Sequence, residues 1–423
     1  MQQALETIEW DLVIVDEAHK MAAYLAPNGY VRKTQAHKLG EVLSRHSTHL
    51  LLMTATPHKG DPDNYRLLIS LVDPEWAEAS HHAQDANPVV LRRTKEEMVK
   101  PNGEPLYPER VVQTLPYSVS AREGELFEQI YKFINKRYRK AKSANQQSAA
   151  FALVTLERRL ASSPYAMRES LIRMRAGVED RLQGSHIARM RILSQESGYE
   201  DWAEWEELAE SDRWKLEAEA ERSATDLIDT RQLKVELQQL DRLIDDVATI
   251  IEQGQQEKIV QLRKACDLWI GERNEQAIIF TEFKDTLDYL RECLHDWGYS
   301  TTQIHGGMNL KDRRDAEKTF WHGEAQVLVA TEAAGEGINL QCCRVMINFD
   351  IPWNPCRLEQ RMGRIHRYGQ QADQVFIFNL VATNTMEGDV KHALLNKLDQ
   401  MKADLGDKVF DVVGSVLWSQ DLR

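Results

Sequence analysis

The sequence predicts an α/β protein in which two parallel sheets are separated by a helical segment. Short apolar runs near the N-terminus are each followed by polar and turn residues, which is typical of buried parallel strands. The same alternation of strands and helices resumes after residue 258. A chain of 423 residues is also too long for one ordinary core, so we expect two or three domains.

The first sheet is predicted from residues 11–57. The run LVIVD ends at Asp16, the run HLLLMTA ends at Ala55, and VRKTQAHKLGEVLSRHS between them has the pattern of a crossover helix. These pieces make one β-α-β unit of a doubly wound sheet. The segments LRRTKEEM and PNGEPLYPERVVQTLPYSVS are rich in turn residues, so we expect this partial lobe, residues 1–115, to end there.

A helical segment with separated charges is predicted for residues 116–254. Ser163 before Pro164 is typical of an N-cap with proline at the first helical position. A seam of a packed helix follows at Leu233, Leu237, Leu240, Ile244, Val247 and Ile251, and packing within its own domain is favoured over a coiled coil. Between Lys132 and Arg191 there are fourteen basic and four acidic residues, whereas acids outnumber bases 18 to 6 between Glu196 and Glu252. We therefore expect a basic face, which is a candidate for local binding of nucleic acid.

The second sheet is predicted within residues 255–390, and a helical tail within 391–423. Its expected strands are QAIIFTE, YSTTQIHGG, AQVLVATE, RVMINFD and QVFIFNLVA. These strands end in or beside polar residues, and ligands of open α/β sheets bind at the carboxyl ends of the strands. This edge is therefore a candidate site.

Composition limits the function classes. A net charge of −13 and a pI near 5.6 count against a protein that coats nucleic acid over its whole surface. Five cysteines, with no CxxC pair, argue against both a disulfide framework and a zinc ribbon. There is no apolar run of about 18 residues and no secretory signal, so we expect a cytoplasmic protein without a membrane span.

Two carboxylates at the tip of the first strand are the strongest candidates for chemistry. In the string DEAH, Asp16 is expected to hold Mg²⁺ directly or through water, and Glu17 to deprotonate the water that attacks a γ-phosphate. His19 is expected to sense the state of the bound nucleotide. Thr54 and Thr56, in the string TATP, are candidates for relaying it, although threonine and proline after a strand are also ordinary turn residues. The alternative for DEAH is a strand that ends in a polar loop.

The second half adds glycines and arginines. The string TEAAGEGINL contains Gly335 and Gly337, which allow close approach of a phosphate or a neighbouring lobe. In QRMGRIHRYGQ, Arg364 and Arg367 stand three apart and would share one face of a helix. Arginine fingers at such a place accelerate phosphoryl transfer by about 10³ to 10⁵. The alternative is an arginine-rich solvated helix.

In order and spacing, DEAH, TATP, IIFTEF, TEAAGEGINLQ, DIPWNP and QRMGRIHRYGQ resemble the motifs of superfamily 2 helicases, and most of all prokaryotic members of the Swi/Snf-type branch. The resemblance covers residues 10–115 and 255–390. It implies two RecA-like lobes that close on ATP and Mg²⁺, with nucleic acid, typically duplex DNA, bound across both. It further implies that His19, Gly335, Gly337 and Gln360 face the nucleotide, and that Thr281, His305 and Thr331 follow a phosphate backbone.

One motif of this family is missing from the sequence. No G-x-x-x-x-G-K-[ST] loop occurs, and Arg32–Lys33–Thr34 has no glycine before the lysine. Without that loop there is no backbone cradle for a triphosphate. We therefore expect an incomplete first lobe with uncovered apolar strands, a motor inactive alone, and a missing segment encoded upstream. The alternatives are a nucleotide-independent nucleic-acid or protein-binding module and a gene remnant.

Overall fold

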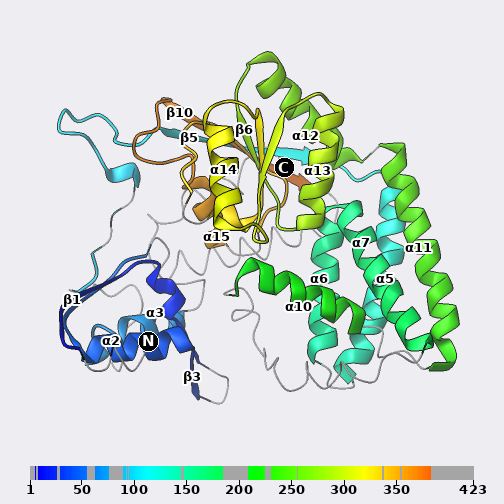
Figure 1. Ribbon diagram of the computed structural model, residues 1–423, viewed down its shortest axis with the longest axis horizontal. Helices are drawn as coiled ribbons and strands as arrows, with labels where there is room; N and C mark the ends of the chain where they lie inside the picture. The colour runs from blue at the N-terminus through cyan, green and yellow to red at the C-terminus, as the bar shows by residue number, and fades with distance from the viewer. Residues whose placement is uncertain are drawn as a thin grey trace. The chain divides into compact units, whose positions relative to one another are not determined.

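The structure is a computed structural model that describes residues 5, 8–25, 29–54, 62–75, 89–91, 93, 95–143, 147–183, 208–223, 230–254, 256–335, 338–352 and 355–382. These residues fall into two compact units (Figure 1). Unit 1 consists chiefly of Met1–Tyr107, and unit 2 chiefly of Pro108–Pro352 and Gln360–Asp389. Each unit has its own parallel sheet.

Unit 1 is built on the predicted β-α-β unit. Strand β1 (Trp10–Val15) pairs in parallel with β4 (Ser47–Leu52), and α2 (Gln35–Arg45) lies between them in sequence. The expected helix begins four residues late, because Thr34 caps it by accepting a hydrogen bond from the backbone of His37 at 3.0 Å. The remaining elements are η1 (Ala18–Met21), the antiparallel pair β2 (Ala23–Leu25) and β3 (Val31–Lys33), α3 (Pro62–Ile69) and η2 (Lys95–Glu97).

The two faces of the β1–β4 sheet differ. One face packs on α2, α3 and η1 through a small core that contains Val13, Val15, Leu50, Leu52, Met21, Leu43, Leu68 and Leu71. The side chains that alternate with these point away from that core, and Leu12, Ile14 and Leu51 are 53%, 55% and 47% exposed. The expectation of an uncovered apolar face is confirmed.

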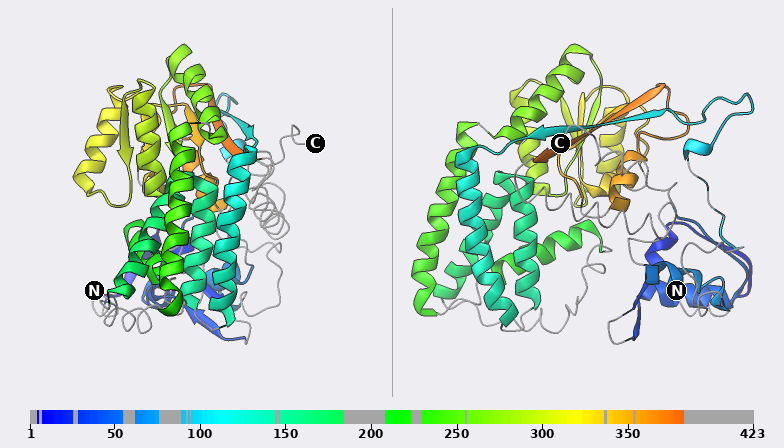
Figure 2. Two further views of the ribbon diagram at one scale, coloured as in Figure 1. Left: turned by 90° about the vertical axis from the view of Figure 1, so that its right-hand side faces the viewer. Right: turned by 180° about the vertical axis from the view of Figure 1, so that it is seen from behind.

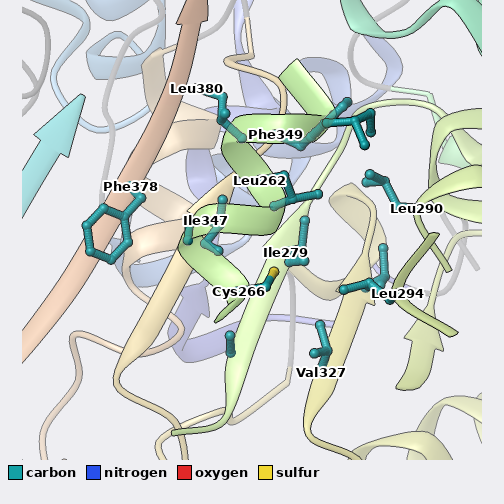
Figure 3. Close-up of a cluster of buried hydrophobic side chains, with 14 of the residues drawn as sticks. Leu262, Cys266, Ile279, Leu290, Leu294, Val327, Ile347, Phe349, Phe378 and Leu380 are labelled. Carbon is teal, nitrogen blue, oxygen red and sulfur yellow. The ribbon is translucent and has the colours of Figure 1, made fainter. Parts of the chain in front are cut away.

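Unit 2 contains a six-stranded, fully parallel sheet in the order β5-β10-β9-β6-β8-β7. Its strands are β5 (Glu109–Tyr117), β6 (Ala277–Phe280), β7 (Thr301–Ile304), β8 (Val327–Ala330), β9 (Val345–Asn348) and β10 (Gln374–Ala382). The associated helices are α12 (Glu257–Cys266), η5 (Asp267–Glu272), α13 (Lys284–Asp296), α14 (Leu310–Trp321) and η6 (Glu332–Gly335). Helix α15 (Pro355–Met362) is divided, since residues 355–359 are grouped with unit 1 and residues 360–362 with unit 2. The four central strands β6, β8, β9 and β10 supply buried side chains such as Ile279, Val327, Ile347 and Phe378 to one core (Figure 3).

Strand β5 corrects the prediction of a turn-rich segment before residue 120. It pairs with β10 from Glu109 to Tyr117, so the expected end of the first lobe near residue 115 falls inside a strand of the second sheet. The segment ERVVQTL has no strict alternation of apolar and polar residues, and it is flanked by Pro108 and Pro116, which favoured the prediction of turns. Pro116 is compatible with this position because β5 lies at the edge of the sheet.

The predicted helical segment forms a bundle within unit 2. Its helices are α5 (Ala121–Ser143), α6 (Gln147–Ser162), α7 (Pro164–Leu182), α10 (Glu210–Ser223) and α11 (Leu233–Gln253), with η4 (Thr230–Gln232) before the last (Figure 2). Ser163 caps α7, as predicted, by accepting a hydrogen bond from the backbone of Ala166 at 3.0 Å. The predicted seam of α11 packs into the bundle core. None of the helices in the described part of the chain has the length and apolar character that crossing a membrane requires.

The expected basic face is wrong for most of the described arginines. Arg137 is buried against Glu236, and Arg175 binds Asp241 at 2.5 Å. Arg158 binds Glu282 at 2.6 Å. Arg137 and Arg175 are thus paired with residues of the acidic segment, and Arg158 with Glu282 outside it. A buried guanidinium such as that of Arg137 requires a counter-charge.

Candidate functional site

The loops after β1 and β4 are tied together by backbone hydrogen bonds. Met53 donates to the carbonyl of Val15 at 2.8 Å, and Ala18 donates to the carbonyl of Met53 at 2.9 Å. Between these contacts Glu17 has a left-handed backbone, with φ of 51°, which is uncommon for a residue with a side chain. The carboxylate of Asp16 accepts the backbone N–H of Glu17 at 2.9 Å. The two acids are thus held on a fixed turn.

The side chain of His19 connects one of these acids to the neighbouring strand. Its ring is buried, and Nδ1 lies 3.3 Å from Oε2 of Glu17 and 3.1 Å from Oγ1 of Thr54. The structure therefore brings together three of the predicted residues, Glu17, His19 and Thr54. Thr56 lies outside the described residues.

Asp16 is exposed beside this cluster and fits a hard cation in chemistry, since carboxylate oxygens are preferred ligands of Mg²⁺. Among the described residues, no group of three or more histidine, cysteine, aspartate or glutamate side chains is placed to hold a metal. A magnesium ion at Asp16 therefore needs further oxygen ligands from a nucleotide, from water or from residues outside the described ranges.

In unit 2, polar residues meet at the carboxyl edge of the sheet. Thr281 follows β6, His305 follows β7, Thr331 follows β8 and Asp350 comes two residues after β9. Because these strands are parallel, the four residues lie along one edge. The predicted nucleic-acid residues are thus brought to the same edge of the sheet.

Asp350 organises this edge, and sequence analysis gave it no role. Its carboxylate accepts hydrogen bonds from the hydroxyls of Thr281 at 2.5 Å and Ser162 at 2.8 Å. It also binds the ammonium group of Lys258 at 3.1 Å. Thr281 is fully buried, so its hydroxyl positions the loop in this arrangement, and its contact with a phosphate backbone stays a prediction.

The other two predicted nucleic-acid residues are buried as well. Thr331 has no exposed surface, and His305 is 8% exposed. The Nδ1 atom of His305 accepts the backbone N–H of Gly307 at 3.1 Å. Burial, with a smaller contribution from the charge of Lys284, lowers the pKa of His305. The ring is therefore neutral at physiological pH and accepts rather than donates at Nδ1.

The prediction that Arg364 and Arg367 share a helix face is wrong. Helix α15 ends at Met362, and the chain continues through Gly363 in a series of turns. The backbone of His366 donates to the carbonyl of Met362 at 2.9 Å, while its ring bonds the carbonyl of Pro108 at 3.0 Å. This anchor to the segment before β5 bends the chain out of the helix.

The two arginines differ in their surroundings. Arg364 is half-buried and donates from Nε to the carbonyl of Gln360 at 3.2 Å, and Arg367 is exposed. Gly335 is the last residue of η6, and Gly337 lies outside the described residues. The structure thus places Arg364 and Gln360 together, while the roles of these residues toward a nucleotide stay predictions.

Arg361 is a second residue that sequence analysis missed. Its side chain is fully buried and binds the carboxylate of Glu332, with Nε 2.9 Å from Oε1. It also donates to the carbonyl of Asp350 at 2.7 Å and to the side chain of Asn348 at 3.2 Å. Arg361 therefore joins α15 to the loops after β8 and β9. The sequence feature that could have identified Arg361 is its place in the same arginine-rich string as Arg364.

Known proteins resemble this chain over both units. Residues 257–369 match the model of the helicase conserved C-terminal domain. The uncharacterized ATP-dependent helicase YqhH of Bacillus subtilis (strain 168) is 30% identical over 418 residues, which are 95% of this chain and 61% of YqhH. The DEAD-box ATP-dependent RNA helicase 35B of Oryza sativa subsp. japonica is 34% identical over 134 residues, 31% of this chain and 22% of that protein.

Among solved structures, the Hef helicase domain of Pyrococcus furiosus has a TM-score of 0.50 at 15% identity, covering 92% of this chain and 76% of that domain. This likeness shows the fold, a RecA-like helicase fold with a parallel sheet. This chain spans 61% of the length of YqhH. Residues 257–369 are therefore similar to the helicase conserved C-terminal domain, and nearly the whole chain is similar to an ATP-dependent helicase.

Proposed function

We propose that the chain is part of an ATP-dependent nucleic-acid motor of the Swi/Snf type that acts on duplex DNA in the cytoplasm. The observation that carries this proposal is the contact of His19 with both Glu17 and Thr54. It links a candidate general base at one strand end to a hydroxyl at the next strand end. Such a link is what a motor needs to connect the state of its nucleotide to the rest of the lobe.

The proposed chemistry divides among the predicted residues. Asp16 would hold the magnesium ion that accompanies ATP, and such an ion would supply positive charge next to the phosphates. Glu17 accepts a proton from the water whose oxygen forms a bond to the γ-phosphorus, as the bond to the leaving ADP oxygen breaks. Arg364 and Arg367 act as arginine fingers that stabilise the charge of the transition state.

The phosphate-binding loop is the part that these 423 residues do not contain. We infer that it comes from a polypeptide segment outside them, and that the 423 residues alone do not hydrolyse ATP. The exposed apolar face of the β1–β4 sheet is a suitable docking surface for that segment, because a doubly wound sheet is covered on both faces. The proposed domain plan keeps residues 1–107 as the partial first lobe and assigns residues 109–117 to the second.

ATP hydrolysis with and without a P-loop-bearing segment tests the proposal. We expect no turnover by the chain alone and duplex-stimulated turnover when the segment is added. Glu17→Gln should lower kcat at least about 100-fold, since it removes the general base. Glu9→Gln is the matched control, because Glu9 is exposed, precedes the same strand and bonds the half-buried ring of His46 at 3.0 Å.

Three results of this assay would contradict parts of the proposal. Brisk turnover by the chain alone would show that the phosphate loop is not needed. Full activity of Glu17→Gln would remove Glu17 as the base. Stimulation by RNA or single strands but not by duplex DNA would replace the proposed substrate while leaving the motor assignment in place.

A further inference from the structure

Helix α10 covers the loops that follow β7 and β8. Its first residue, Glu210, accepts the backbone N–H of Ala333 at 2.7 Å. The same side chain packs so closely on Gly306 that a Cβ added there would lie 2.6 Å from the Cβ of Glu210. One turn later, the ring of Trp214 lies 5.8 Å from the ring of His305. Two independent contacts therefore seat α10 on these loops.

The chemistry around Glu210 is that of an anion site. A carboxylate oxygen takes a backbone N–H in a loop after a parallel strand, and backbone N–H groups of this kind also bind phosphate oxygens. The close approach to Gly306 brings the anion against bare backbone. The Thr331 hydroxyl faces the same carboxyl group and favours its charged form.

The electrostatics make this contact costly. Burial raises the pKa of Glu210 to about 7, and the nearby charge of Glu332 adds to the rise. Thr331, Arg213 and the N–H of Ala333 oppose it. The ionised carboxylate is therefore only partly compensated, and α10 sits on the loops with a reduced net stability.

Helix α10 also forms ion pairs with arginines of the bundle. Glu217 binds Arg159 at 2.9 Å, and Glu221 binds both Arg159 and Arg173. Both glutamates are buried. Helix α10 thus lies on two features that the sequence associated with nucleic acid, the loops at the sheet edge and the basic residues of α6 and α7.

We propose that α10 is an intramolecular competitor for nucleic acid on this lobe, and that Glu210 holds the place of one phosphate group. Nucleic acid binds the loops after β7 and β8 when α10 leaves them. This inference rests on the proposed function, because it requires that these loops bind a phosphate backbone. The contacts of Glu210 and Trp214 set the fraction of molecules in which the loops are open.

Binding of a fluorescein-labelled 30-base-pair DNA duplex to the full chain tests the proposal. At pH 6 Glu210 is mostly protonated in the docked helix, so its charge no longer opposes docking. Under that condition Glu210→Ala and Trp214→Ala each remove one contact that keeps the site closed and should each lower Kd, Glu210→Ala by up to about tenfold, as expected for loss of the hydrogen bond from Ala333. Asp212→Asn is the control. It removes a carboxylate from the same helix, but Asp212 is exposed and its carboxylate binds Lys215 of α10 itself at 3.2 Å.

Hydrogen exchange gives a second measurement on the wild-type chain. Adding the duplex should increase exchange in peptides from residues 210–223, while amides of the loop at residues 331–334 stay protected. Circular dichroism of each variant confirms that the bundle is folded. Tighter binding by both variants together with faster exchange in α10 supports the competitor.

Two outcomes would overturn it and separate it from the proposed function. If the duplex binds with no change of exchange in α10, and the two variants bind like the wild type, α10 is a permanent part of the lobe and the motor proposal stands. If neither the wild type nor the variants bind duplex DNA, single-stranded DNA or RNA, both proposals fail.

Discussion

Removal of the buried guanidinium of Arg361 should destabilise unit 2 severely. In Arg361→Met the carboxylate of Glu332, which is 11% exposed, loses its counter-charge, and the carbonyl of Asp350 loses a donor. Breaking a buried pair on one side costs about 3–5 kcal/mol. For a unit of this size each kcal/mol lowers Tm by about 2–4 °C, so a fall of about 6–20 °C is expected.

Scanning calorimetry is the assay, because two compact units can unfold in separate transitions. Arg367→Met is the matched control, since it makes the same chemical change at an exposed position and should shift Tm by less than about 2 °C. The double variant Arg361→Met with Glu332→Met should recover part of the loss, because no buried charge is left alone. A fall under 2 °C in Arg361→Met, or no recovery in the double variant, would refute the reasoning.

Three further outcomes are expected. Docking raises the pKa of Glu210 from its ordinary 4.5 to about 7, so protonation favours the docked state. Helix α10 should therefore dock about tenfold more weakly at pH 8 than at pH 6; equal protection of the α10 amides at both pH values, relative to the intrinsic exchange rate at each, would contradict this. Lys258→Met should lower the Tm of unit 2 by at least about 5 °C, since Lys258 is buried against Asp350 and the carbonyls of Ala161 and Ser162. An unchanged calorimetric transition would show that the Lys258–Asp350 ion pair does not stabilise the unit. Ile14→Thr should change the Tm of unit 1 by less than about 2 °C, because Ile14 is exposed. The same variant should capture less of a P-loop segment in a pull-down. A large fall in Tm would show that the side chain is covered.

Elements with a strong local pattern were predicted well. The apolar runs that became β1, β4, β6, β8 and β9 are short and bounded by polar residues, and Ser163 with Pro164 announced the start of α7. Local chemistry is sufficient in these cases, because period and capping depend on neighbours in the sequence. The clustering of Glu17, His19 and Thr54 follows from the same logic, since parallel strands bring their carboxyl ends together.

Features that depend on distant partners were missed. Strand β5 needs β10, which lies more than 250 residues later, and no neighbour in the sequence announces that pairing. Arg159 and Arg173, on α6 and α7, resembled part of a nucleic-acid patch because their counter-charges lie far away in the sequence, on α10 and at Asp285 of α13. No feature of the sequence distinguishes Glu210 from the many other acids around it. Its role depends on the contact with the backbone N–H of Ala333, which lies far away in the sequence.

The pairing of α10 with the bundle has an electrostatic consequence. Arg159 and Arg173 face three carboxylates in this structure, two from α10 and the third from Asp285, which lies 2.5 Å and 3.0 Å from the two guanidiniums. In the proposed open state two guanidiniums would share one carboxylate, and the net charge of this group of side chains would change from negative to positive. Arginines that are buried and neutralised in the docked state would then attract a polyanion.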